Sequence, residues 1–156
     1  MSTIDTNFTY SDFKPVLSRK KRKNKAKVEP PPLITLVEQA REELAKDDWN
    51  SGCQQILREH LTVHSLFPVQ VLCLGLGSPS SSPNSRFQLG FLLEICKSMH
   101  IEHANVSVYD PVFSKEDSAL FEELGMRLLS ENKEGRYPLD TPTILWVRIR
   151  QLVGSR

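Results

Sequence analysis

The sequence predicts an α/β protein built on a parallel, Rossmann-like sheet. Residues 69–75 form an apolar run rich in Val and Leu, which is typical of a strand buried on both faces. Two glycines one residue apart end this run. A helical pattern over 86–99 follows, and then a second apolar strand over 105–109 that leads into Asp110. Strand, glycine turn, helix and strand in this order form a βαβ unit.

A basic arm is predicted ahead of this unit. Residues 1–32 contain eight Lys and Arg against three Asp and Glu, whereas residues 33–156 contain twelve against sixteen. The arm holds few core-forming residues and ends in three prolines, so we expect 1–32 to be disordered and 33–156 to form one domain. Seven of the nine residues of Arg19–Lys27 are basic. Such a run can serve as a nuclear-import signal, a nucleic-acid contact or a solubilising tail.

Two helices are predicted before the first strand. The first covers residues 33–47 and the second about 51–64, and each has apolar residues at helical spacing. The stripe of the second helix consists of Cys53, Ile56, Leu57, His60 and Leu61. His60 and His64 have a spacing that could suit a metal, but no third ligand lies nearby in the sequence, so a surface or packing role is favoured.

The third helix, 86–99, contains a glycine at its centre. Gly90 costs about 1 kcal/mol there relative to alanine. This cost predicts that the sheet or another helix approaches the backbone closely at Gly90.

The second half of the chain predicts one more helix and two strands. Ser114 can cap this helix, Asp117 can answer it in a variant of the capping box, and Gly125 closes the helix. Strands are expected at 126–129 and 143–147. The doubly wound order is then 3-2-1-4, with strand four at an edge because no later strand follows it. The sheet is therefore expected to be incomplete.

A candidate ligand site lies where the first two strands end. The backbone N–H groups of Gly75 and Gly77 and the hydroxyl of Ser78 could hold a small anionic molecule, and Asp110 could accept hydrogen bonds from a ribose. The spacing is unusual, since a third glycine and a Walker lysine are missing and Asp110 follows Gly75 by 35 residues instead of about 20. A turn with a purely structural role is the alternative.

Other residues give little indication of chemistry. Cys53, Cys73 and Cys96 lie in apolar patterns without metal-ligand spacing, which predicts buried free thiols in a reducing compartment. No Ser-His-Asp arrangement stands out, so we assign no catalytic residue, no metal ligand and no cofactor, and a non-enzymatic protein is favoured. No apolar stretch approaches the ~18 residues of a membrane helix, and the polar start predicts no signal peptide. These observations favour the cytoplasm, with the nucleus as a further location.

Several segments together resemble a known family. They are Leu72–Ser78, Ser85–Leu89, Val108–Phe113, Leu124–Gly125 and Glu131–Asn132. In this order they are similar to the sensitivity-to-red-light-reduced family, and most closely to its animal members, over about residues 68–147. The resemblance implies a Rossmann-like domain. It also implies a regulatory role in circadian clock gene expression and in heme (tetrapyrrole) biosynthesis, with no established catalytic mechanism.

The chain departs from the family after the fourth strand. Family members continue into further helices, whereas this chain ends nine residues after Val147. The resemblance therefore implies a C-terminally shortened form, acting on protein partners that the sequence does not identify. Two alternative functions remain: an enzyme or sensor that binds a nucleotide or S-adenosylmethionine at the glycine turn, and an RNA-contacting module that uses the basic arm.

Overall fold

A computed structural model describes residues 29–134 and 136–147. The helices are α1 (Leu33–Ala45), α2 (Asp48–Val63), α3 (Pro83–Met99) and α4 (Lys115–Glu123), with a short 3₁₀ turn η2 (His103–Asn105). The strands are β1 (Gln70–Leu74), β2 (Val106–Tyr109), β3 (Arg127–Leu128) and β4 (Thr143–Val147). Of the predicted arm, only residues 29–32 are described, and they are exposed and outside helices and strands. Arg19–Lys27 and the residues after Val147 lie outside the described residues.

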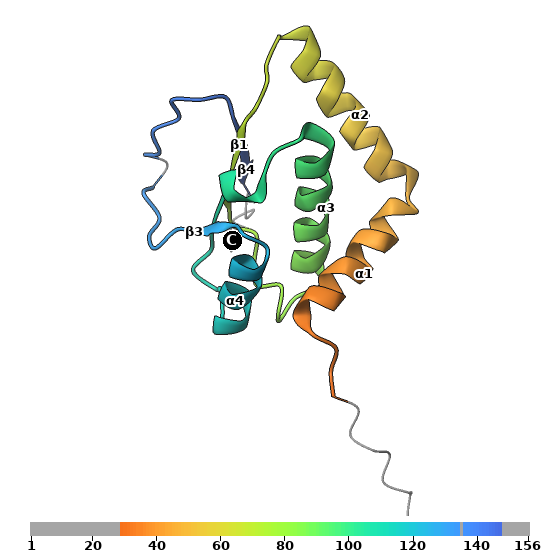
Figure 1. Ribbon diagram of the computed structural model, residues 1–156, viewed down its shortest axis with the longest axis vertical. Helices are drawn as coiled ribbons and strands as arrows, with labels where there is room; N and C mark the ends of the chain where they lie inside the picture. Colours follow the sequence, from red (N-terminus) through yellow and green to blue (C-terminus); the bar gives the residue numbers. More distant parts are fainter. Residues whose placement is uncertain (1–28, 135, 148–156) are drawn as a thin grey trace, which may run out of the picture. The chain divides into compact units, whose positions relative to one another are not determined.

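The four strands form one sheet in the order β3-β2-β1-β4, and every neighbouring pair is parallel (Figure 1). Val71 of β1 is paired with Val106 on one side and with Ile144 on the other. Helix α3 connects β1 to β2 and α4 connects β2 to β3. The predicted Rossmann-like fold, with its order 3-2-1-4 and its two preceding helices, is confirmed.

Some predicted boundaries of helices and strands were wrong. Two helices begin earlier than predicted because capping residues extend them. Helix α2 begins three residues earlier than expected, since the Asp47 carboxylate accepts a 3.0 Å hydrogen bond from the Trp49 N–H. Helix α3 also begins three residues earlier, at Pro83, behind the cap residue Ser82. Strand β3 is shorter than predicted, because only Arg127 and Leu128 pair with β2.

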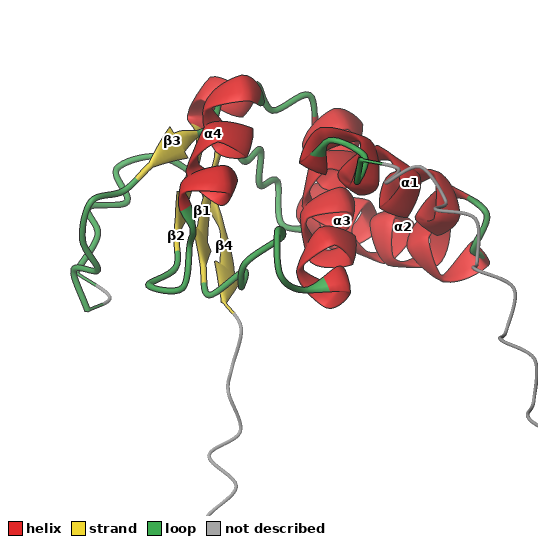
Figure 2. Cartoon of the chain, turned by 90° about the horizontal axis from the view of Figure 1, so that it is seen from below, coloured by secondary structure: helices red, strands yellow, loops and turns green. Residues whose placement is uncertain are grey.

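The core lies on one face of the sheet. Side chains alternate between the two faces of a strand, and the residues turned toward the helices are apolar on each of the three longer strands. They are Val71 and Cys73 on β1, Val106 and Val108 on β2, and Ile144 and Trp146 on β4. Leu89, Leu92 and Cys96 of α3, Leu120 and Phe121 of α4 and Val37 of α1 complete this core. Helices α1, α2 and α3 lie together on one side of the strands (Figure 2).

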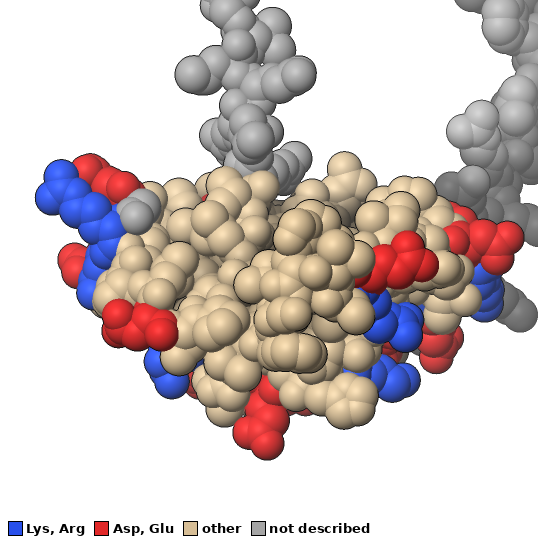
Figure 3. Space-filling model, turned by 90° about the horizontal axis from the view of Figure 1, so that it is seen from above, with Lys and Arg blue, Asp and Glu red and all other residues tan. Residues whose placement is uncertain are grey.

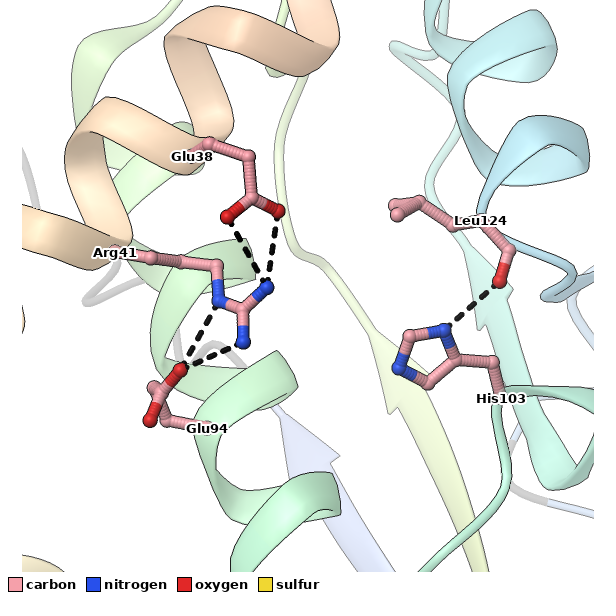
Figure 4. A network of polar contacts seen from close by, with 5 residues as sticks. All are labelled: Glu38, Arg41, Glu94, His103 and Leu124. Atoms are coloured by element: carbon pink, nitrogen blue, oxygen red, sulfur yellow. Dashed lines mark hydrogen bonds and ion pairs between the residues drawn. The ribbon is translucent and has the colours of Figure 1, made fainter.

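Helix α1 packs closely on α3 at Gly90, as the central glycine predicted. A Cβ atom at Gly90 would lie 3.1 Å from the Arg41 Cγ and 3.4 Å from the Arg41 backbone nitrogen. The Arg41 guanidinium binds the Glu94 carboxylate of α3 at 2.7 Å and the Glu38 carboxylate of its own helix at 2.9 Å (Figure 4). These contacts fix α1 against the layer that covers the sheet.

Helix α2 is less covered than its sequence pattern predicted. Its first turn is anchored by buried Asn50 and by Trp49, whose ring centroid lies 5.2 Å from that of Phe91. Farther along, Ile56 is 69% exposed and His60 is also exposed, contrary to the predicted stripe. Among the described residues, no element packs over that part of the helix closely enough to bury it.

Exposed apolar side chains lie at the end of α2 and on the approach to β1. Val63, Leu66, Phe67 and Val69 are all exposed there. Figure 3 views the molecule from the top of Figure 1, where these segments lie, and shows charged side chains mainly around the rim.

Within the described ranges, no helix is both long and apolar enough to cross a membrane.

Candidate functional site

The predicted site lies on the loop between β1 and α3. Gly75 and Gly77 adopt φ values of 81° and 80°, a left-handed conformation that residues with a Cβ rarely adopt. Between them, the Leu76 side chain turns inward and is fully buried. The two glycines therefore let the chain turn away from the strand, while the Leu76 side chain packs into the core beneath the loop.

The structure brings Gly77 and Asp110 together. The Gly77 N–H donates a 2.7 Å hydrogen bond to one carboxylate oxygen of Asp110, which directly follows β2. The Val112 N–H donates to the other oxygen at 3.1 Å. Gly75 extends the pairing of the strands, since its N–H donates to the Tyr109 carbonyl at 3.0 Å. Asp110 thus occupies the glycine N–H group that the sequence suggested for an external anion.

A second carboxylate binds the same loop. Asp117 of α4 is fully buried and accepts hydrogen bonds from the Ser78 hydroxyl at 2.6 Å and from the Ser80 N–H at 2.8 Å. It also accepts from the Ser114 N–H at 2.8 Å, while its own N–H donates to the Ser114 hydroxyl. The predicted capping box is therefore confirmed, and the same carboxylate clamps the glycine loop to α4.

Hydrogen bonding keeps Asp117 charged in this buried position. Burial favours the neutral form, but the hydrogen bonds from Ser78, Ser114 and Ser80 outweigh it and hold the pKa of Asp117 below its ordinary value. The hydroxyl of Ser78, itself buried, donates a hydrogen bond directly to this carboxylate. Among the described residues, no histidine hydrogen-bonds to Ser78 or Asp117, so this pair lacks the base that usually activates a serine nucleophile.

One basic side chain contacts the loop. Arg86, in the first turns of α3, donates from Nε to the Pro79 carbonyl at 2.8 Å. Next to it, the Ser85 hydroxyl is buried without a hydrogen-bond partner among the described residues. These two residues lie beside the loop with donor groups that the contacts above do not use.

The cysteines are free thiols with different exposure. Cys73 and Cys96 are buried as predicted, whereas Cys53 is only partly buried. Burial raises the pKa of the Cys73 thiol to about 12, with a smaller contribution from the Asp110 charge, and raises the pKa of Cys96 to about 11. Burial and the raised pKa both disfavour the thiolate form of Cys73 and Cys96 at neutral pH.

Sequence reasoning missed how much of the loop's hydrogen bonding the protein itself supplies. The sequence indicated Asp117 only as part of a helix cap. It indicated Arg86 only as a member of Ser85–Leu89, one of the segments that carry the family resemblance. The capping-box spacing is a local signal for Asp117, but nothing in the sequence links it to Ser78, 39 residues away.

Within the described ranges, no group of three His, Cys, Asp or Glu side chains is arranged to hold a metal ion.

The fold and the loop define a Rossmann-like α/β protein with a glycine turn after its first strand. A model of the SRR1 domain matches residues 53–147, so the chain belongs to the SRR1 domain family. The match covers all four strands and most of α2, and thus begins earlier than the segments that carried the resemblance. No solved structure matches the chain.

The chain is similar in sequence to parts of two longer proteins. The chain is 35% identical over 80 residues to the SRR1-like protein of Mus musculus, covering 51% of this chain and 32% of the mouse protein. It is 31% identical over 87 residues to the protein Sensitivity to Red Light Reduced 1 of Arabidopsis thaliana, covering 56% of this chain and 32% of the plant protein. The matched region is thus about a third of each relative.

Proposed function

We propose that the chain is a regulatory protein without catalytic activity of its own. The observation that carries this proposal is that the glycine-loop N–H groups of Gly77 and Ser80 already bind the protein's own carboxylates. A loop held in this way serves as a junction between the strand ends and α4. Membership of the SRR1 family and the name of the plant relative support a regulatory role.

The regulated processes in this proposal are circadian clock gene expression and heme biosynthesis. The test is to deplete the chain in cells that produce it and to record the rhythm of clock transcripts and the rate of heme synthesis. We expect both to change and to be restored by the wild-type chain. A chain with Asp140→Asn, a change on an exposed loop, is the matched control and should restore them fully. If neither process responds to depletion, the proposed regulation is wrong.

A small anionic ligand at the glycine loop is a second candidate function. Gly77 already holds an anionic oxygen, Arg86 lies beside the loop, and Ser85 contributes a buried hydroxyl without a described partner. A nucleotide or S-adenosylmethionine entering here would have to displace the Asp110 carboxylate from the Gly77 N–H. Asp110 then acts as an internal competitor of the ligand, instead of its ribose acceptor.

These two roles of Asp110 predict opposite results. Thermal shift of the full chain with ATP, S-adenosylmethionine and heme would first show whether any of them binds. If Asp110 competes, Asp110→Asn should tighten the binding of ATP, because the substitution removes a negative charge from the loop. If Asp110 holds the ribose, the same substitution should weaken it. Absence of any shift for all three compounds, with wild type and variant alike, would count against ligand binding at this loop.

The substitution Gly77→Val, which would block access to the loop N–H groups, is a poor probe of this site. At φ 80° a β-branched residue is strained, so the substitution would reduce stability as well as access to the N–H group. Asp110→Asn keeps the backbone and the shape of the side chain, and is therefore preferred.

RNA contact through Arg19–Lys27 is a third candidate, based on the charge of that segment alone. Binding of a single-stranded RNA that weakens steeply with salt, and that is lost when Lys20, Lys21, Arg22 and Lys23 are changed to Ala, would support it. The same variant tests nuclear import, since a tagged chain should then move from the nucleus toward the cytoplasm. Unchanged RNA binding and unchanged distribution would favour a solubilising tail.

A further inference from the structure

Among the described strands, β4 lies at an edge of the sheet. It pairs with β1 on one side, and no described strand lies on its other side. The Val69 N–H donates to the Pro142 carbonyl at 3.0 Å, so the Pro142 backbone faces β1. Because alternate residues of a strand face the same neighbour, the backbone groups of Ile144 and Trp146 also face β1. Those of Thr143, Leu145 and Val147 therefore point away from the sheet.

The side chains of this edge are uncharged and partly exposed. Leu145 is 53% exposed and Val147 is 50% exposed, while Ile144 and Trp146 pack against the core. Edge strands usually carry a lysine, a proline or a bulge that prevents pairing with another chain. The segment Thr143–Val147 contains neither lysine nor proline, and pairs with β1 in continuous register along its whole length.

We propose that β4 pairs antiparallel with β4 of a second copy of this chain, around a two-fold axis at Leu145. The outward-facing residues are spaced symmetrically about Leu145, so Leu145 would meet its own counterpart and Val147 would meet Thr143 of the other copy. The unpaired backbone groups of each copy would then be satisfied by the same groups of its partner. An isologous contact of this kind closes on itself as a dimer and joins two four-stranded sheets into one.

The size of the contact sets its strength. A pair of five-residue strands buries less than the ~1,200 Å² of a typical stable interface, so the dimer is expected to form at micromolar concentration. The full chain contains twenty Lys and Arg against nineteen Asp and Glu, so its net charge of +1 makes two copies repel each other only weakly at long range. Salt screens this repulsion and should leave association unchanged or strengthen it.

Sedimentation velocity of the full chain over the micromolar range tests association. Residue-resolved amide exchange tests the geometry. We expect the amides of Thr143, Leu145 and Val147 to become protected as the protein concentration rises, while those of Ile144 and Trp146 are protected at all concentrations. A chain that remains monomeric throughout this range, or one that dimerises without this alternating pattern, would overturn the proposal.

Charge substitutions at the axis provide a second, independent test. Leu145→Lys and Leu145→Glu each place two like charges opposite one another, and each should weaken dimerisation about tenfold or more. An equimolar mixture of the two variants should restore it, which a general loss of folding could not do. Ile56→Lys replaces another exposed apolar residue, on α2, and is the matched control, with unchanged association expected.

Sedimentation measured at increasing salt concentration distinguishes the β4 interface from an alternative contact between the basic arm and the acidic body. If the basic arm of one copy bound the acidic body of another, added salt would weaken association, and Leu145→Lys would have no specific effect. That result, or failure of the Lys and Glu variants to pair with each other, would rule out the β4 interface.

Discussion

The Ser78 hydroxyl donates a 2.6 Å hydrogen bond to the Asp117 carboxylate, which joins the loop after β1 to the first turn of α4. The same carboxylate also completes the capping box of that helix. One buried charge therefore stabilises both a helix terminus and the conformation of the glycine loop. Its removal should affect two elements that lie far apart in the sequence.

Asp117→Ala should lower the free energy of unfolding by about 3 kcal/mol, because it leaves the buried Ser78 hydroxyl and the N–H groups of Ser80 and Ser114 without their acceptor. Urea denaturation measures this loss. Ser118→Ala, on the same helix, is the control and should cost less than about 0.5 kcal/mol. A double-mutant cycle with Ser78→Ala should give a coupling energy of about 1 kcal/mol or more. Simple additivity would show that the hydrogen bond contributes nothing to stability.

Stability should fall in acid partly through Asp117. The pKa of its carboxyl is lower in the folded protein than the ordinary value of about 3.9 in the unfolded chain. The ionised group therefore contributes its full stabilisation above that ordinary value, and the contribution is lost as the pH falls from there through the folded pKa. In denaturation series from neutral to acid pH, Asp117→Asn should show a shallower decline than wild type. Parallel curves for the two proteins would contradict this assignment.

The three cysteines should differ in their reactivity toward a thiol reagent. At pH 8 only Cys53 should react rapidly, because Cys73 and Cys96 are buried and have pKa values of about 12 and 11. Cys53→Ser should abolish the fast phase, and all three thiols should react after unfolding in urea. Rapid modification of the Cys53→Ser variant would mean that the core opens more readily than its packing indicates.

Two helix glycines should respond differently to substitution. Gly52→Ala should raise the free energy of unfolding by about 0.5–1 kcal/mol, because its new Cβ meets no atom within 4 Å. Gly90→Leu should lower it by about 1–3 kcal/mol, because α1 fills the space beside Gly90. Thermal or urea denaturation gives both values. A Gly90→Ala variant that gains as much as Gly52→Ala would show that α1 can move away at no cost.

Local sequence patterns were sufficient to predict the elements and their order. The apolar run before Gly75, the second run before Asp110 and the third over Thr143–Val147 became the three longer strands of the sheet. The strand order follows from right-handed crossovers, which restrict a chain of this pattern to few topologies. The capping box at Ser114 was also predictable, since it depends on residues within one turn of α4. The close approach at Gly90 was predictable only as an approach, because a glycine inside a helix does not show which element packs against it.

Tertiary structure alone decided what the glycine loop contacts and how far α2 is covered. Asp110 and Asp117 reach the loop from positions 33 and 39 residues away from Gly77 and Ser78, because parallel strands bring their carboxyl ends to one edge of the sheet. The exposure of Ile56 likewise depends on which elements pack against α2. Periodicity and caps act within a few residues and can be read from the sequence. Hydrogen bonds between distant segments and the burial of a helix face depend on how complete elements meet in space.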